Sequence, residues 1–312
     1  MSAVTDVPTA TDVPTAIDVP TAMVSHLGAT RFGPFEIRWS EIGPDRAPRV
    51  LLLHGVYAGA HSFEWRRLAP VLATDFRVRA VDLLGAGNSD RPSIEYAPEV
   101  LTRAVGALID DAEPDYVVAS SLTGAYAVRA LAEGDSAASL LLLTPTGLGR
   151  PREAARRRRR RWLFDLMRAT PLGALVVRGL TSSASVRWFQ THRTYHDPRF
   201  LDEEELRETK RAGRAPGAKY LQLAFVFDRL SIDLDPASIR SLTPTVIWGR
   251  GQRFTDNAEA ARWRRAGATV VEVPSGLPQV EDPFGVAALL AFEGRRGAGT
   301  TGSRRPAARS TG

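Results

Sequence analysis

Short apolar runs alternate with segments of helical spacing over most of the chain. Val50–Leu53 is a continuous apolar run of the kind found in buried parallel strands, and Tyr116–Ala119 is another that ends in small residues. This alternation predicts a mostly parallel sheet with helices on both faces. The expected strands are Val50–Leu53, Arg77–Leu83, Tyr116–Ala119, Leu140–Leu143, Thr245–Trp248 and Thr269–Val273, and the expected helices include Val100–Asp110 and Ala125–Ala132.

Three segments lack this alternation of predicted strands and helices. Residues 5–22 repeat TDVPTA, TDVPTA and IDVPTA, which have little to bury, so we expect a disordered leader over residues 1–30. Residues 294–312 are rich in Gly, Arg and Ser and predict a disordered basic tail. The stretch of about 150–235 is helical, charged and aromatic. We expect it to form a cap over the carboxyl edge of the sheet, within one domain of residues 31–293.

Composition narrows the classes of function. The absence of cysteine excludes disulfides and thiolate chemistry. The net charge of +6 suggests a nucleic-acid ligand, but 39 of the 41 basic residues are arginine, which indicates a coding bias. Six consecutive arginines, Arg156–Arg161, point in all directions on a helix and predict a solvated face rather than a binding groove. We expect no nucleic-acid partner, no membrane span and a cytoplasmic location.

Three motifs carry candidate chemistry. His54-Gly55-Val56 follows a strand, where backbone N–H groups can approach a substrate oxygen. Asp82 opens a glycine-rich loop and is expected to hold that loop by hydrogen bonds, with a role as catalytic acid as the alternative. Ser121 lies among small residues between a strand and a helix, as in a nucleophile elbow, and the alternative is an ordinary N-cap serine.

Together these motifs resemble the α/β-hydrolase superfamily, from about residue 31 to residue 292. The resemblance implies an α/β-hydrolase fold: a mostly parallel sheet flanked by helices, with a helical cap insertion. It places Ser121 at the nucleophile position, and it places the backbone amides of Val56 and Leu122 in the oxyanion hole. Tyr57 belongs to the same loop and is a candidate for substrate binding.

The sequence departs from the family pattern at three positions. Thr123 stands where the elbow normally has glycine, and Gln252 occupies the position of the catalytic acid. Gly276 lies where the catalytic histidine is expected. The chain has five histidines, and none follows His196, so no shift of register restores the missing one. General-base help is worth about 10²–10⁴-fold in rate, so ordinary fast esterase chemistry is not expected.

Replacements for the missing groups lie in the loop and the insertion. His54 is a possible alternative base, although in the family this residue is usually structural. The expected substrate-binding side chains of the insertion are Trp188, His192, His196, Tyr220 and Phe225. No third ligand accompanies His192 and His196, so no metal is expected.

These observations favour an enzyme without a cofactor that acts on a small hydrophobic molecule. The expected chemistry is ester or acyl hydrolysis or transfer, or a related non-standard reaction, centred on Ser121. Two alternatives stay open: an inactive pseudo-hydrolase that binds a small ligand, and a lyase- or cyclase-type tailoring enzyme without covalent catalysis. The sequence does not define the oligomeric state.

Overall fold

The computed structural model describes residues 26–148 and 161–300 and confirms the α/β-hydrolase fold. Its sheet has eight strands in the order β1-β2-β4-β3-β5-β6-β7-β8. β2 pairs antiparallel with β1 and β4, and all other pairs are parallel. The strands are β1 His26–Phe32, β2 Phe35–Ile42, β3 Arg49–Leu53, β4 Arg77–Val81, β5 Tyr116–Ser120, β6 Ser139–Leu143, β7 Thr245–Gly249 and β8 Thr269–Val273.

The apolar run of β3 is continuous because both faces of the sheet are covered. Leu51 and Leu53 belong to the core beneath α2, α3, α10 and α11, whereas Val50 and Leu52 belong to the core beneath α1 and α13. Successive side chains of a strand point to opposite faces, so each core receives every second residue. These helices are α1 Leu68–Leu72, α2 Pro98–Ala112, α3 Ser121–Glu133, α10 Pro236–Leu242, α11 Ala258–Ala266 and α13 Pro283–Thr300.

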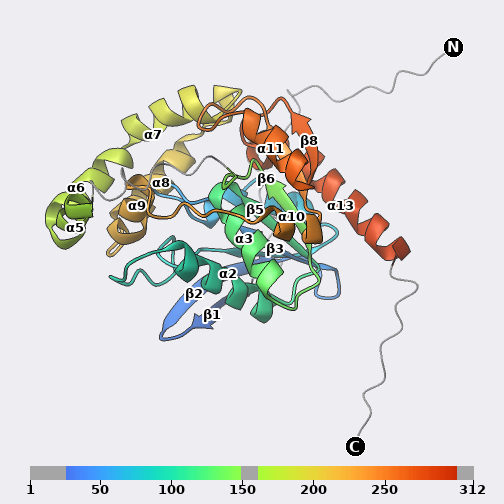
Figure 1. Cartoon of the computed structure of the whole chain (residues 1–312). Helices are drawn as coiled ribbons and strands as arrows, with labels where there is room; N and C mark the ends of the chain where they lie inside the picture. The colour runs from blue at the N-terminus through green and yellow to red at the C-terminus, as the bar shows by residue number, and fades with distance from the viewer. Residues whose placement is uncertain (1–25, 149–160, 301–312) are drawn as a thin grey trace, which may run out of the picture.

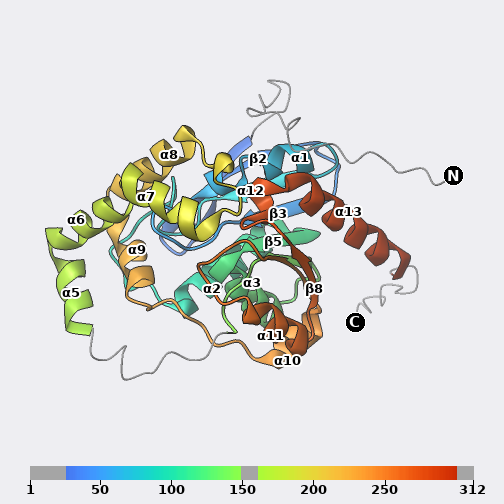
Figure 2. The same ribbon diagram turned by 90° about the horizontal axis from the view of Figure 1, so that it is seen from above.

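A helical insertion separates β6 from β7 and gathers at one end of the sheet (Figures 1 and 2). It meets the loops that follow β3, β7 and β8, so it lies at the carboxyl ends of these strands. Its elements are α5 Arg161–Ala169, α6 Pro171–Leu180, α7 Ser183–Phe189, the π-helix Gln190–Thr194 (η2), the 3-10 turn Pro198–Phe200, α8 Glu203–Arg214 and α9 Lys219–Val226.

The ends of the domain differ from the expected boundaries. β1 begins at His26, so residues 26–30 form part of the sheet rather than of the leader. α13 continues to Thr300, beyond the expected end at residue 293. The hexapeptide repeats, the arginines 156–160 and residues 301–312 lie outside the described residues.

Candidate active site

Ser121 stands at a strained turn between β5 and α3. Its φ is +52°, a left-handed conformation that costs a residue with a side chain about 1–3 kcal/mol. Small neighbours make the turn possible, because a Cβ added to Gly55 would lie 3.3 Å from the Ser121 Cβ. The side chain is partly exposed, whereas the preceding Ser120 is buried. The local geometry is therefore that of a nucleophile elbow.

Thr123 replaces glycine without disrupting this turn. Its hydroxyl is fully buried and donates a 2.6 Å hydrogen bond to the carbonyl oxygen of His54. The extra side chain thus ties the turn at Ser121 to the loop that follows β3.

His54 is held on both ring nitrogens. The Leu83 backbone N–H donates to Nε2 over 3.0 Å, which leaves the proton on Nδ1, and Nδ1 donates to the Gly55 carbonyl over 2.7 Å. Burial lowers the pKa of His54, although Asp82 and Glu64 act in the opposite direction. With both nitrogens engaged, the histidine has no free lone pair for the Ser121 hydroxyl. These contacts favour its structural role over its role as an alternative base.

Asp82 holds the glycine-rich loop in the way the sequence predicted. Its carboxylate accepts hydrogen bonds from the backbone N–H groups of Ser62 at 2.8 Å and Asn88 at 2.7 Å. Burial raises the pKa of Asp82, but nearby His54 and these hydrogen bonds outweigh burial and hold it below its usual range. The carboxylate is fully used in positioning backbone.

A buried polar chain lies beside the elbow. Glu64, in the 3-10 turn Ser62–Trp65 (η1), accepts a hydrogen bond from the Gly55 N–H at 3.0 Å and from the Gln279 side-chain amide at 2.7 Å. The same amide lies 3.3 Å from the Ser120 hydroxyl. The sequence interpretation missed both residues. The only available signal was a carboxylate between two aromatic residues, Phe63 and Trp65.

Gln252, at the acid position, fixes a turn. Its side-chain oxygen accepts from the backbone N–H groups of Phe254 and Thr255, each at 2.9 Å, and its amide donates to Asn257 Oδ1 at 3.1 Å. The residue is 1% exposed. Its polar atoms are occupied by its own loop, so the side chain stabilises the loop instead of orienting a base.

The insertion packs against Gly276, which the resemblance places at the histidine position. A Cβ added to Gly276 would overlap the carbonyl oxygen of Thr194 and lie 2.9 Å from the His196 backbone nitrogen. Two further contacts hold this segment: Arg253 N donates to Arg193 O at 2.7 Å, and Asp197 N donates to Glu281 Oε1 at 2.8 Å. No side chain fits at Gly276 unless the insertion moves.

All five histidines lie within the described residues, and none hydrogen-bonds to Ser121. His61 caps η1, where its Nδ1 accepts from Phe63 N at 3.3 Å. His192 is exposed, stacks on Trp188 at 5.3 Å and bonds the carbonyl of that residue. His196 is exposed and packs beside Gly251.

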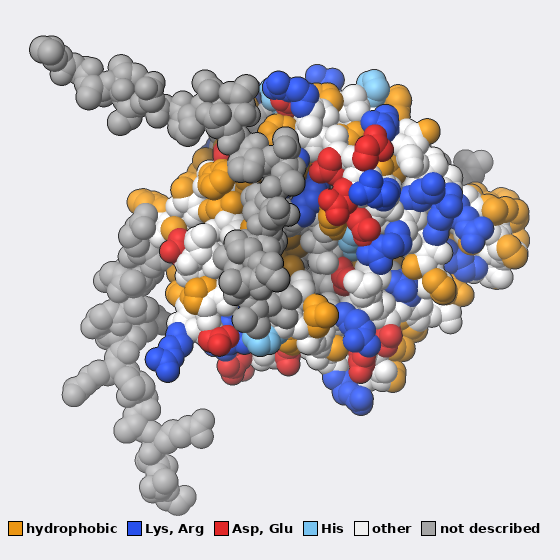
Figure 3. Space-filling model, turned by 180° about the vertical axis from the view of Figure 1, so that it is seen from behind, with side chains coloured by type: hydrophobic (Ala, Val, Ile, Leu, Met, Phe, Trp, Pro, Cys, Tyr) orange, Lys and Arg blue, Asp and Glu red, His pale blue; other side chains and the backbone are white. Residues whose placement is uncertain are grey.

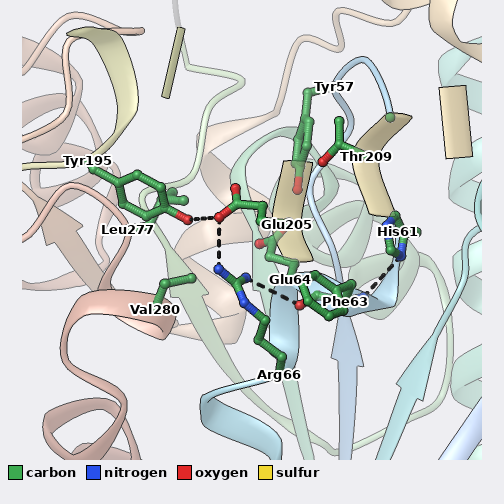
Figure 4. Close-up of a pocket in the computed structure, with 11 residues that line it drawn as sticks. Tyr57, His61, Phe63, Glu64, Arg66, Tyr195, Glu205, Thr209, Leu277 and Val280 are labelled. Carbon is green, nitrogen blue, oxygen red and sulfur yellow. Dashed lines mark hydrogen bonds and ion pairs between the residues drawn. The ribbon is translucent and has the colours of Figure 1, made fainter. Parts of the chain in front are cut away.

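The expected substrate-binding residues separate into two groups. Trp188 and Phe225 are 58% and 38% exposed, and half-buried Tyr220 packs beneath Lys219 and Arg168. Of the six candidates, only Tyr57 lines the small pocket between η1 and the insertion (Figure 4). The remaining lining residues are Gly59, His61, Phe63, Glu64, Arg66, Tyr195, Glu205, Thr209, Leu277 and Val280.

Glu205 organises this pocket. It accepts from Arg66 Nη2 at 2.8 Å, from the Tyr195 hydroxyl at 2.7 Å and from Gln190 Nε2 at 2.8 Å (Figure 4). Burial raises the pKa of Glu205, although Arg66 acts in the opposite direction, and burial also raises the pKa of Tyr57. The free space of about 10 Å³ is roughly that of one water molecule.

The part of the chain that the structure describes has neither a candidate metal centre nor a candidate membrane span. Residues 26–148 and 161–300 contain no group of three His, Asp or Glu side chains suited to a metal ion. Over the same residues, every helix is too short or too polar to cross a bilayer.

The profile of the alpha/beta hydrolase family matches residues 50–289, so the chain belongs to this family. A segment of 68 residues is 43% identical to 2-hydroxy-6-oxo-6-(2'-aminophenyl)hexa-2,4-dienoic acid hydrolase of Metapseudomonas resinovorans, covering 22% of this chain and 23% of that protein. A segment of 102 residues is 32% identical to an uncharacterized protein of Mycobacterium tuberculosis, covering 32% and 29% respectively. The chain thus matches less than a third of the length of each of these relatives.

Solved structures support the fold over a longer span. The epoxide hydrolase CorEH superposes with a TM-score of 0.66 at 19% identity, covering 88% of this chain and 100% of that chain. The 2-hydroxy-6-oxo-6-phenylhexa-2,4-dienoate hydrolase of Rhodococcus sp. strain RHA1 superposes with a TM-score of 0.65 at 19% identity, covering 87% and 100%. These similarities define the architecture and leave the substrate open.

Proposed function

We propose that the protein acts on a hydrophobic small molecule that carries an ester or another acyl group, with the acyl carbon at Ser121. The observation that carries this proposal is the left-handed backbone of Ser121, at a φ of +52°. A strained residue persists only where its surroundings hold it, and such strain clusters at functional sites. Membership of a hydrolase family and hydrolase-named relatives support the same class of chemistry.

The backbone around Ser121 supports a site for a carbonyl oxygen. Within the described residues, no carbonyl or side chain accepts a hydrogen bond from the Val56 or Leu122 amide. Leu122 is the second residue of α3, and the first amides of a helix favour negative charge. In the proposed reaction these two amides hold the oxygen of the acyl group. The Ser121 oxygen bonds to the acyl carbon and loses its proton to solvent water, and the bond from that carbon to the oxygen of the leaving group breaks.

Proton transfer is the slow part of the proposed reaction. A general base contributes about 10²–10⁴-fold, and no histidine contacts Ser121. An ester with a good leaving group avoids part of this deficit, because a weakly basic anion such as p-nitrophenolate departs without a proton. Deacylation has no such relief, since its leaving group is the Ser121 oxygen, a basic alkoxide that must be protonated as it departs. We therefore expect activated esters to acylate Ser121 faster than the acyl group is released.

Intact-protein mass spectrometry after incubation with p-nitrophenyl esters tests the proposal. The expected result is one acyl group on the wild type and none on Ser121→Ala. Ser241→Ala serves as the matched control, because Ser241 is an exposed serine on α10. Turnover that survives in Ser121→Ala would contradict covalent catalysis and favour the lyase- or cyclase-type alternative.

Ligand binding without turnover is the second candidate. The specific observation in its favour is the packing of Thr194 on Gly276, which fills the histidine position with backbone. Saturable binding of the same esters, with neither adduct nor product, would support this candidate and exclude the first.

A further inference from the structure

Two consecutive peptide groups carry the loop after β3 past the elbow, where a Cβ added to Gly55 would lie 3.3 Å from the Ser121 Cβ. One joins His54 to Gly55, the other joins Gly55 to Val56, and both are trans. The C=O and the N–H of a trans peptide point in opposite directions, so a contact at either end fixes the direction of the other. The direction of the Val56 N–H is therefore set by whatever holds these two peptide groups.

Buried side chains hold three of the four polar ends of these peptide groups. The His54 carbonyl accepts from the Thr123 hydroxyl at 2.6 Å, and the Gly55 N–H donates to Glu64 Oε2 at 3.0 Å. The Gly55 carbonyl accepts from His54 Nδ1 at 2.7 Å. Within the described residues, no group accepts from the fourth end, the Val56 N–H. The loop is thus held firmly while one donor is left unused.

Gly55 makes such external support necessary. A side chain there would crowd the elbow, so the position favours glycine. Glycine has no Cβ to restrict rotation about its own bonds, and the two peptide groups could otherwise turn relative to each other. Thr123 stands where the family pattern has glycine, so its hydroxyl provides a contact that a glycine could not make.

Glu64 is an unusual carboxylate in this protein. Figure 3 shows Asp and Glu side chains on the surface, several of them beside Lys and Arg side chains. Glu64 is instead 6% exposed, and no Lys or Arg of the described residues forms an ion pair with it. A buried carboxylate is costly unless it is paired or hydrogen-bonded. Its contacts with N–H groups therefore indicate what this side chain does.

Both oxygens of Glu64 are engaged by N–H donors. Oε2 accepts from Gly55, and Oε1 accepts from Gln279 Nε2 at 2.7 Å. Hydrogen bonds to a carboxylate are stronger than those between neutral groups. In the described part of the chain no hydrogen bond joins Glu64 to the Ser121 hydroxyl. The carboxylate is thus arranged to hold backbone and not to take a proton from Ser121.

We propose that Glu64 and Thr123 are positioning residues that direct the Val56 N–H toward the oxygen of the acyl group. They hold the first peptide group from both ends, and His54 holds the second. The inference rests on the proposed acyl chemistry at Ser121. An oxyanion donor stabilises the transition state more than the bound ester. Loss of its direction should therefore slow acylation and leave ester binding nearly unchanged.

Single-turnover kinetics of the full chain with p-nitrophenyl butyrate test the proposal. The burst of p-nitrophenolate, measured over a range of ester concentrations, gives the acylation rate constant and the Kd of the ester. Glu64→Ala is expected to acylate roughly 10²-fold more slowly than the wild type, and Thr123→Val roughly tenfold, each with the Kd within about twofold. Thr123→Ser restores the hydroxyl and should recover most of the rate.

Glu64→Gln separates positioning from proton transfer. The new amide can accept from the Gly55 N–H, and it can donate to Gln279 Oε1 once the Gln279 amide turns over. That oxygen is buried and has no partner among the described residues. Acylation by Glu64→Gln should therefore stay within about fivefold of the wild type. A loss as large as that of Glu64→Ala would assign a proton-transfer role to the carboxylate and overturn the proposal.

Thr102→Val is the matched control, because Thr102 is 4% exposed on α2 and its hydroxyl has no partner in the described part of the chain. It should acylate like the wild type. Circular dichroism checks the folding of every variant, and the Thr123 pair decides alone if Glu64→Ala does not fold. Wild-type acylation rates in Glu64→Ala and Thr123→Val, or a weaker Kd at an unchanged rate, would overturn this proposal alone. A wild type that is never acylated would overturn the proposed function as well.

Discussion

The packing of Gly276 gives the sharpest test of how the insertion sits on the domain. In Gly276→Ala the new methyl group would overlap the Thr194 carbonyl oxygen and approach the His196 nitrogen at 2.9 Å. Both neighbours are backbone atoms and cannot rotate away. Either the insertion or the loop after β8 must therefore shift.

The expected cost follows from what that shift disturbs. Overpacking a well-filled site costs about 1–3 kcal/mol. The shift also disturbs the hydrogen bond from Arg253 N to Arg193 O and that from Asp197 N to Glu281, each worth about 0.5–1.5 kcal/mol. The free energy of unfolding should therefore fall by about 2–6 kcal/mol. At roughly 2–4 °C per kcal/mol, the melting temperature should fall by about 4–24 °C.

Gly106→Ala provides the control for this substitution. Gly106 lies within α2, and a Cβ added there would meet nothing within 4 Å. Alanine should stabilise that helix by about 0.5–1 kcal/mol. Thermal unfolding measures both effects, and hydrogen exchange at the Arg253 amide localises the first. Equal melting temperatures for the two variants would refute the docking of Thr194 on Gly276.

Three further predictions concern single side chains. Thr123→Val should lower the free energy of unfolding by about 1–3 kcal/mol, because the buried His54 carbonyl loses its donor; an unchanged denaturation midpoint would contradict this role. Burial raises the pKa of Glu259 to about 7, whereas an unfolded glutamate titrates near 4.3, so the folded state retains a proton that the unfolded state releases. Stability should therefore fall as the pH rises from about 4.3 to 7, and Glu259→Gln should remove that fall, as urea titrations at several pH values would show. Tyr57→Phe should change the KM for p-nitrophenyl esters while Trp188→Ala should not, because Tyr57 and Ser121 both lie next to Gly55, whereas Trp188 is 58% exposed on the insertion; the reverse pattern would move the substrate to the outer insertion.

Local patterns were sufficient to predict the centre of the fold. The run Val50–Leu53 and the small residues around Ser121 each reflect a local requirement, burial on both faces in one case and a tight turn in the other. The antiparallel pair β1–β2 was missed for a physical reason. β2 buries Glu41 between Arg77 and Arg79, so a charge occupies a position where an apolar residue would have marked the strand.

Local sequence patterns could not predict the polar contacts of the site. Gln279 reaches Glu64 across 215 positions of sequence, and neither residue belongs to a recognisable motif. The contact between Gly276 and Thr194 likewise depends on how the insertion folds back over the sheet. Sequence could show that a histidine was missing, but not which atoms occupy its place.

The three departures from the family pattern share one property. Thr123 bonds the His54 carbonyl, Gln252 bonds its own loop, and Gly276 receives the backbone of the insertion. Each replacement is satisfied by its neighbours, so the site is not a triad with groups simply deleted. In the proposed site, packing takes the place of the proton-transfer groups, while Ser121 keeps its left-handed backbone. A site of this kind is better suited to binding a carbonyl group than to rapid proton transfer. The decisive observation for Ser121 is therefore the accumulation of an acyl adduct, and not the rate of hydrolysis.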